Sequence, residues 1–283
     1  MKILVKNLFY SYNHGKSFAN IDINTSFSSG EFVAIVGHTG SGKSTFVQNL
    51  NALIIPSKGE VAIDDVVITS KGKIKNIKEI RKKIGIVFQF PEYQLFEETI
   101  EKDILFGPKN FNMNEEELKG LASKVLSVVG LDDSFLEKSP FELSGGEKRR
   151  VAIAGILAFD PEVLIVDEPT AGLDPSSANK MMELFKKLNE MGKTIILVTH
   201  NMDHVLQYAD RVLVFKDGRL ESDTSPIKLF KNLDLVQSLQ LDLPNIIELV
   251  NLLAKKYPKI LNYDIKCIDD FIDAYKDVIS LWH

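Results

Sequence analysis

The sequence Gly37-His38-Thr39-Gly40-Ser41-Gly42-Lys43-Ser44 decides the fold of this chain. It has the spacing Gly-x-x-x-x-Gly-Lys-Ser, follows the apolar run 32–36 and precedes a helical pattern over residues 46–53. A strand, a glycine-rich turn and a helix in this order let backbone N–H groups point into an anion site. In such a loop Lys43 reaches the β- and γ-phosphates of a nucleotide, Ser44 offers a hydroxyl to Mg²⁺, and Thr45 continues the loop into the helix. The sequence therefore predicts nucleotide binding within an α/β fold.

Further buried strands end in polar residues suited to chemistry. They are 84–88 before Gln89, 163–166 before Asp167 and Glu168, and 194–199 before His200. Parallel α/β sheets bind ligands at the carboxyl ends of their strands, so these residues are expected at one site. Acids that end a wholly apolar run are costly unless a cation or donor meets them, although both could be surface acids. We expect Asp167 to hold the hydration shell of Mg²⁺ and Glu168 to polarise the attacking water as general base.

Gln89 and His200 carry little information when taken singly, because a lone glutamine or histidine often follows a strand. They become informative because each follows a buried strand, as the phosphate loop and Asp167 do. Gln89 can contact Mg²⁺ or water, and His200 can donate a hydrogen bond to the γ-phosphate.

The motif Leu143-Ser144-Gly145-Gly146-Glu147 has a local explanation and a functional one. Locally it is a capping box, in which Ser144 caps a helix through residues 151–158 and Glu147 reaches back. An exposed helix start with two glycines also offers unpaired N–H groups to a phosphate, and this chain's own phosphate is already held by its own loop. The motif therefore indicates a second nucleotide held by a second subunit.

Composition places the chain among ordinary globular proteins, with 283 residues of which 45% are hydrophobic. A single cysteine, Cys267, cannot pair within the chain, so a cytosolic location is the default. Apolar runs are far shorter than the roughly 20 residues that cross a bilayer, and residues 1–7 show no export signal. The net charge of −5 argues against a nucleic-acid partner.

The chain divides into two parts by pattern. Residues 1–225 are predicted to form the nucleotide-binding domain, with β-rich runs at 3–5, 21–23 and 60–68 and a helical subdomain inserted at about 90–159. In that subdomain we expect a helix capped by Asn114 and closed by Gly130, and Lys216-Asp217-Gly218-Arg219 predicts a hairpin. Residues 226–283 are predicted to form a small C-terminal helical extension. Its apolar stripes either pack on their own domain or present a partner surface.

Three motifs stand in this order along the chain: the phosphate loop 37–44, the Leu143–Glu147 motif, and the apolar run that ends in Asp167 and Glu168. Together they resemble the motifs of the ATP-binding cassette (ABC) ATPases, over about residues 1–225. The resemblance implies a P-loop NTPase of the ABC ATPase type with an antiparallel β lobe, binding ATP and Mg²⁺. It implies that Ser44, Gln89 and Asp167 serve the metal and that Leu173-Asp174 is the D-loop pair. Gln89 would be the Q-loop glutamine and His200 the switch histidine, and Tyr12 would stack on adenine, although Tyr12 could equally be a strand residue packing inward.

A narrower resemblance lies in the segment Phe88-Gln89-Phe90-Pro91-Glu92-Tyr93-Gln94-Leu95-Phe96-Glu97-Glu98-Thr99, in the run 106–111, and in Gly37-His38-Thr39-Gly40. These are similar to the energy-coupling factor (ECF) transporter ATPases, specifically the second of the two paired subunits. The resemblance implies an ATPase on the cytoplasmic face of the cell membrane that powers uptake of vitamins or other micronutrients. It would pair with a related ATPase, although a homodimer is possible, and would work with a substrate-binding membrane protein. A membrane coupling protein would dock near Gln89 to Thr99.

Several rival functions share some or all of these motifs. The ATPase of a conventional importer or of a dedicated cobalt or nickel uptake system has the same core motifs. A DNA-repair or chromosome-organising ATPase is disfavoured, because only about a hundred residues without heptads separate Lys43 from Ser144. One departure from the resembled pattern is Glu147, where glutamine is commonest. A glutamate there would place a carboxylate near the partner's nucleotide.

Overall fold

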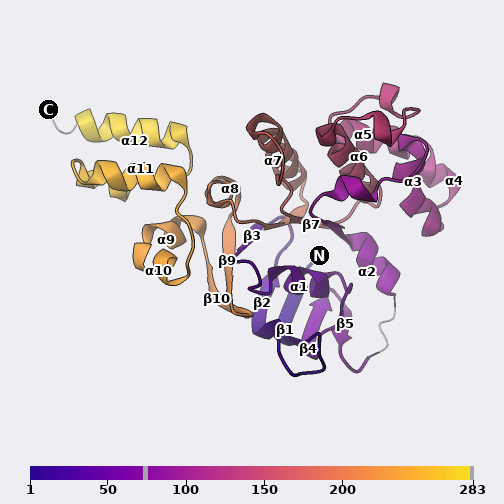
Figure 1. Ribbon diagram of the computed structural model, residues 1–283, viewed down its shortest axis with the longest axis horizontal. Coiled ribbons are helices and arrows are strands. Elements are labelled where there is room, and N and C mark those ends of the chain that lie inside the picture. Colours follow the sequence, from indigo (N-terminus) through magenta and orange to yellow (C-terminus); the bar gives the residue numbers. More distant parts are fainter. Residues whose placement is uncertain (73–75, 281–283) are drawn as a thin grey trace.

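The computed structural model describes residues 1–72 and 76–280 (Figure 1), so the last three residues of the predicted extension lie outside the described residues. Within that range, the central element is a six-stranded sheet in the order β10-β9-β3-β8-β7-β6. Its strands are β3 (Phe32–Val36), β6 (Ile84–Val87), β7 (Val163–Asp167), β8 (Thr194–Val198), β9 (Arg211–Lys216) and β10 (Arg219–Thr224). All neighbours pair in parallel except β9 and β10. The carboxyl ends of β3, β6, β7 and β8 therefore share one edge, as the sequence predicts.

A smaller antiparallel sheet forms the β lobe, in the order β2-β1-β4-β5. Its strands are β1 (Ile3–Tyr10), β2 (Asn20–Phe27), β4 (Lys58–Ile63) and β5 (Val66–Thr69). The run 60–68 is thus a hairpin rather than one strand. Asp64 adopts a left-handed φ of 48°, a conformation that Asp tolerates better than most residues, and the chain reverses there.

Two hydrophobic cores cover the two faces of the six-stranded sheet. Successive residues of β3 alternate between them, with Val33 and Ile35 in one and Ala34 and Val36 in the other. The first core joins the sheet to the β lobe and to α1 (Lys43–Leu50) and α2 (Ile77–Lys83). The second packs α7 (Pro175–Glu190), α8 (Met202–Tyr208) and the helical subdomain against the opposite face. Burial on both faces explains why these strands are continuously apolar.

The helical subdomain lies to one side of the sheet (Figure 1). Its elements are η1 (Pro91–Gln94), α3 (Ile100–Asn110), α4 (Glu115–Leu118), α5 (Leu121–Val128), η2 (Asp133–Phe135), η3 (Pro140–Glu142) and α6 (Gly145–Leu157). The single helix predicted from Asn114 to Gly130 is wrong, because the structure divides it into α4 and α5. Lys119 is extended and Gly120 has a φ of 69°, so the ladder of helical hydrogen bonds breaks there.

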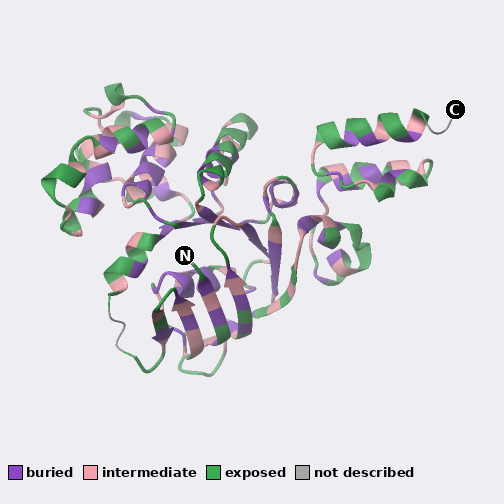
Figure 2. Cartoon of the chain, turned by 180° about the vertical axis from the view of Figure 1, so that it is seen from behind, coloured by how far each residue is buried: buried purple, intermediate pink, exposed green. Residues whose placement is uncertain are grey.

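The C-terminal helices form two groups, one next to the main sheet and one farther from it (Figure 1). They are α9 (Pro226–Lys231), α10 (Leu233–Ser238), α11 (Asn245–Ala254), η4 (Pro258–Asn262) and α12 (Ile268–Ser280). Leu229 and Phe230 of α9 belong to the core of the main sheet, whereas α11, η4 and α12 share a small core of their own. Both α11 and α12 alternate buried and exposed stretches (Figure 2). Apolar side chains are among the exposed ones, at Leu249 and Leu252 on α11 and at Ile268 and Ile272 on α12, so the apolar stripes are only partly covered by the described residues.

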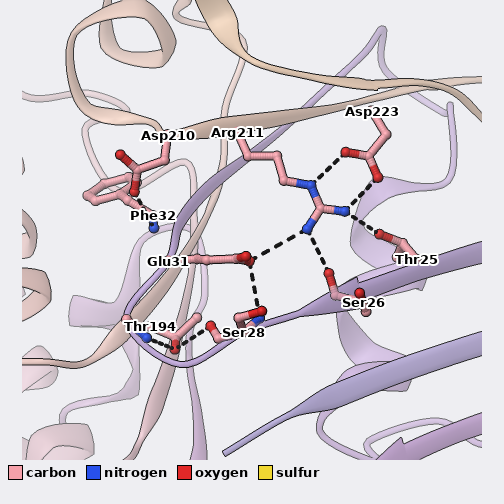
Figure 3. A network of polar contacts seen from close by, with 10 residues as sticks. Thr25, Ser26, Ser28, Glu31, Phe32, Thr194, Asp210, Arg211 and Asp223 are labelled. Atoms are coloured by element: carbon pink, nitrogen blue, oxygen red, sulfur yellow. Dashed lines mark hydrogen bonds and ion pairs between the residues drawn. The ribbon is translucent and has the colours of Figure 1, made fainter.

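Arg211 at the start of β9 ties the two sheets together (Figure 3). Its guanidinium donates to both carboxylate oxygens of Asp223 on β10, at 2.6 and 2.5 Å. It also donates to the Ser26 carbonyl at 2.7 Å and the Thr25 hydroxyl at 3.1 Å, both on β2, and lies 3.5 Å from Glu31. The hydrogen bonds that Arg211 donates to Asp223 raise the pKa of Arg211, which favours the cation.

Candidate functional site

The glycine-rich loop joins β3 to α1 and lies close against neighbouring backbone. Gly37 has a φ of 143°, and a Cβ there would lie 2.1 Å from the Phe215 carbonyl oxygen. Gly42 has a φ of 98°, and a Cβ there would lie 2.3 Å from the Ala19 carbonyl oxygen. Neither position has room for a side chain, which explains the glycines in physical terms. Thr39 and Gly40 form the exposed tip of the loop.

The β9–β10 turn supports this loop from one side. The backbone N–H of Gly218 donates to the Ser41 carbonyl at 3.1 Å, and Nε2 of His38 lies 3.5 Å from a carboxylate oxygen of Asp217. The hairpin predicted at residues 216–219 is confirmed, with positive φ at both Asp217 and Gly218. Its contribution to the loop could not be read from the sequence.

Lys43 lies across the loop with its ammonium turned inward. Its Nζ donates to the carbonyl oxygens of Gly37 at 2.6 Å and His38 at 3.0 Å. Burial lowers its pKa, while Glu168 and Asp167 act to raise it. Nearby, the buried hydroxyl of Ser41 has no hydrogen-bond partner among the described residues. A half-buried cation, a buried hydroxyl without a partner and a loop of close-packed glycines fit a polyphosphate.

Asp167 and Ser44 meet at the end of β7. The Ser44 hydroxyl donates to Oδ2 of Asp167 at 3.3 Å. Burial and the neighbouring Glu168 raise the pKa of Asp167, against smaller lowering effects of Ser44 and Lys43. A partly buried carboxylate with a raised pKa gains from a cation, and hydroxyl and carboxylate oxygens are ligands that Mg²⁺ prefers. The residues present therefore fit a magnesium site.

Glu168 and His200 also lie together. Nδ1 of His200 is 2.8 Å from Oε1 of Glu168, and the Thr199 hydroxyl is 3.4 Å from Oε2. Glu168 has a left-handed φ of 49°, and its backbone N–H donates to the Val198 carbonyl at 2.9 Å. This bond to the end of β8 fixes the turn in which the side chain sits. A carboxylate held beside an imidazole can orient water and accept its proton.

Gln89 follows β6 and is exposed. In the sheet register Val87 lies opposite Val166, so the residues after β6 run alongside Asp167 and Glu168. The structure thus brings Lys43, Ser44, Asp167, Glu168 and His200 together with Gln89 at the adjacent strand end, at the edge that the sequence predicts.

Ser144, Gly146 and Glu147 lie elsewhere, in a separate cleft of about 720 Å³ that they line with Leu173 and Asp174. Ser144 caps α6 in a capping box, with Glu147 accepting from the Ser144 N–H at 2.9 Å and its hydroxyl at 2.6 Å. These hydrogen bonds lower the pKa of Glu147, so its negative charge persists at neutral pH. Asp174 caps α7 by accepting from Ser176 and Ser177.

Tyr12 lies just beyond β1 and is 64% exposed, so inward packing as a strand residue is wrong. Its hydroxyl shares a 3.1 Å hydrogen bond with the Thr45 hydroxyl on α1, and its ring meets Tyr10 edge to face. The ring is therefore held beside the phosphate loop with free surface around it.

A family model described as "ABC transporter" matches residues 21–171. The chain belongs to the ABC transporter family. Two relatives named "Energy-coupling factor transporter ATP-binding protein EcfA2" extend the similarity over the length of the chain. The one from Staphylococcus saprophyticus is 47% identical over 281 residues, 98% of each chain. The one from Enterococcus faecalis is 52% identical over 260 residues, 90% of each chain.

Solved ABC structures agree with the fold. The cbiO1 protein from Clostridium perfringens, described as part of the ABC transporter complex cbiONQ, superposes with a TM-score of 0.74 at 38% identity over 88% of this chain and 98% of that one. A dimeric ATP-binding cassette in a post-hydrolysis state with ADP and Pi gives a TM-score of 0.69 at 35% identity over 79% of this chain and 98% of that one. These findings confirm the ABC ATPase fold and the resemblance to energy-coupling factor ATPases, so the chain is an ABC ATPase.

Arg149 is a functional candidate of this ABC ATPase that sequence reasoning missed. It follows the Ser144–Glu147 motif on α6 and is only 2% exposed. The one signal in the sequence was its spacing of four residues from the apolar Ile153, which places it on the buried face of the helix. Its partners lie 20, 22 and 57 positions away and could not be read from that spacing.

Proposed function

We propose that the chain is the ATP-hydrolysing subunit of an ECF-type importer that takes up vitamins or other micronutrients. The observation that carries this proposal is the full-length similarity to energy-coupling factor ATP-binding proteins, together with the array of Lys43, Ser44, Asp167, Glu168 and His200. No helix in residues 1–72 and 76–280 is long and apolar enough to cross a membrane. We place the protein as a peripheral subunit on the cytoplasmic face of the cell membrane, without a nucleic-acid partner.

Within the ATP site, the roles follow from position. The loop from Gly37 to Thr45 holds the phosphates, with Lys43 at the β- and γ-phosphates, and Tyr12 stacks on adenine. Ser44, Gln89 and Asp167 would hold Mg²⁺, which neutralises developing charge on the phosphates when bound. Glu168 accepts the proton of the attacking water, and His200, kept in place by Glu168, donates to the γ-phosphate.

The second part of the proposal is head-to-tail pairing with a related ATPase. Ser144, Gly146, Glu147 and Asp174 line a cleft that includes none of the phosphate-loop residues, so the Ser144-Gly145-Gly146-Glu147 motif is free to meet the nucleotide of a partner. ATP then bridges two subunits and ADP does not, so closure follows ATP binding and opening follows hydrolysis. A homodimer would use the same surfaces.

The membrane coupling protein is proposed to dock at the segment from Gln89 to Thr99. A hollow of about 320 Å³ lies there between this segment, α3 and α6, lined by Leu95, Phe96, Asp103 and Phe106 among others. Phe96 and Phe106 are 56% and 44% exposed and meet edge to face at 4.8 Å. Exposed aromatic pairs beside a hollow suit a helix of another protein.

A second candidate is the ATPase of a dedicated cobalt or nickel uptake system, or of a conventional ABC importer. The similarity to cbiO1, from a complex described as cbiONQ, favours it.

Purification of the tagged protein from its native membranes in mild detergent, with mass spectrometry of co-purifying proteins, separates these functions. We expect a related ATPase, one membrane coupling protein and several different small membrane proteins. A single fixed substrate-binding component or a fixed pair of permeases would favour the second candidate. Recovery of DNA-associated proteins without membrane proteins would contradict both.

A further inference from the structure

The side chain of Arg149 connects two segments that serve different parts of the proposed cycle. Its Nε and Nη2 donate to the two carboxylate oxygens of Glu92, at 3.0 and 2.8 Å. Its Nη1 donates to the carbonyl oxygens of Pro169 at 3.0 Å and Ala171 at 2.9 Å. One guanidinium thus contacts η1 on one side and the turn after Glu168 on the other.

This connection is enclosed and charged. The side chains of Arg149 and Glu92 are 3% and 14% exposed, and the guanidinium also lies 5.6 Å from the centre of the Phe90 ring. Burial acts to raise the pKa of Glu92, but the hydrogen bonds and charge of Arg149 hold it below its usual value. A planar, bidentate pair of this kind resists rotation and sliding, which a lysine could not reproduce.

The two segments that the pair joins have backbones under local constraint. Phe90, two residues before Glu92, has a φ of 55°, and Glu168, next to Pro169, has a φ of 49°. Non-glycine residues hold such conformations only where the surroundings fix them. The fixed geometry of the Arg149 side chain lets a displacement at one turn reach the other.

We propose that Arg149 is a positioning residue that couples the segment from Gln89 to Thr99 to the turn that carries Glu168. When the membrane coupling protein binds to that segment, Glu92 is displaced. Arg149 moves with Glu92 and displaces Pro169 and Ala171, to which it is hydrogen bonded. The inference rests on the proposed function, because it assumes that the segment docks a membrane protein.

The test compares ATP hydrolysis by the ATPase pair alone with hydrolysis by the purified membrane complex, measured as phosphate release. The ratio of the two rates reports coupling and is insensitive to the fraction of folded protein. The thermal stability of each variant is measured separately as Tm. Three changes are made: Glu92→Gln, Arg149→Met, and the double change Glu92→Met with Arg149→Met. Lys148→Met is the matched control, because it removes a half-buried cation one residue earlier on the same helix.

In Glu92→Gln and Arg149→Met we expect the influence of the membrane proteins on hydrolysis to fall about tenfold, the scale of a coupling energy between sites. Lys148→Met should keep the wild-type ratio. The double change removes both buried charges and should recover Tm without recovering the ratio, because an apolar pair packs but does not fix the two turns.

A ratio that stays at the wild-type value in the single variants while Tm falls would overturn the inference, since the pair would then be structural only. Recovery of both Tm and the ratio in the double variant would overturn it as well. If the wild-type ATPase pair binds no membrane protein, the proposed function fails and takes the inference with it. That outcome is distinct, because it appears before any variant is made.

Discussion

Glu168 shows how a single residue is prepared for chemistry in this chain. Its left-handed φ of 49° and the bond from its N–H to Val198 turn its side chain toward His200, 2.8 Å away. Asp167 beside it has a raised pKa and faces Ser44, so the adjacent acids occupy different environments. This difference is the physical basis for assigning them different roles.

Glu168→Gln is expected to keep ATP binding and to lower hydrolysis by a factor of about 10² to 10⁴, because an amide cannot accept the proton of the attacking water. Nucleotide binding and single-turnover hydrolysis are the measurements. Glu190→Gln, at the exposed end of α7, is the control. An unchanged steady-state rate in the assembled complex would show that another group is the base.

His204 on α8 is expected to make the stability of the protein depend on pH. Burial lowers its pKa against the opposing effect of Asp203, and its Nδ1 has no hydrogen-bond partner among the described residues. The folded state therefore binds the proton more weakly than the unfolded state. Its contribution to stability is present above the unfolded pKa of about 6.5 and is lost as pH falls toward the folded pKa.

We expect the free energy of unfolding to decrease from pH 7.5 to pH 5.5 and His204→Gln to flatten this decrease. The slope from one group cannot exceed about 1.4 kcal/mol per pH unit. Denaturant unfolding at both pH values is the measurement, with exposed His14→Gln as control. An identical slope in wild type and His204→Gln would contradict this reading.

Among the structural elements, the β9–β10 hairpin forms one edge of the six-stranded sheet and also contacts the phosphate loop and the β lobe. Its turn supports the phosphate loop through Gly218, and Arg211 at its base reaches the β lobe through Ser26 and Thr25 (Figure 3). The hairpin therefore joins the two sheets between which the loop lies.

Arg211→Met is expected to destabilise the fold by about 2 kcal/mol, because Asp223 loses a bidentate partner in a half-buried place. Denaturant unfolding measures the loss. Arg219→Met, exposed on the same hairpin, should stay within about 0.5 kcal/mol of wild type. Equal effects of the two substitutions would show that the network adds no stability.

The start of α6 carries a charge that the helix itself holds in place. Glu147 is part of the capping box and stays ionised, and the same motif is proposed to face the nucleotide of a partner. Glutamine at this position keeps the cap and removes the repulsion from phosphate.

In a Glu168→Gln background, Glu147→Gln should lower the ATP concentration needed for pairing about threefold, an effect of under 1 kcal/mol as expected for a charge that stays partly in solvent. Analytical ultracentrifugation across an ATP series is the measurement. Glu142→Gln, exposed just before the motif, is the control. Weaker pairing in Glu147→Gln would mean that the carboxylate contributes a favourable contact.

For the whole molecule, the C-terminal helices leave apolar surface open. Leu252 is 61% exposed, Leu261 47% and Ile268 56%, beside the small core of α11, η4 and α12. Ile247 of α11 nevertheless reaches the main core, so removing the whole extension would also damage the nucleotide-binding part. Point substitutions are the cleaner test.

If the C-terminal apolar stripes form a surface for the related ATPase, Leu252→Gln with Leu261→Gln is expected to weaken pairing by about tenfold, since each substitution removes exposed apolar area from that surface. Tm and ATP binding by the single chain should not change. Pairing affinity is measured by ultracentrifugation, with Val67→Gln, exposed on β5 of the β lobe, as control. Intact pairing would assign the stripes to the chain's own packing.

Local sequence determined the phosphate loop, the buried strands with their terminal polar residues, the capping box at Ser144 and the hairpin at Asp217. Each depends on residues within a few positions, where backbone geometry and side-chain chemistry act directly. The break between α4 and α5 also has a local cause, Gly120. The helical spacing of apolar residues continues across Gly120, so the pattern predicted one helix.

Only the tertiary structure decided that Glu168 meets His200, that Arg149 joins Glu92 to the turn after Glu168, and that the Ser144 motif lies apart from the chain's own phosphate loop. These relations join residues far apart in the chain. Sheet order and register set them, and no local pattern encodes which strand lies beside which.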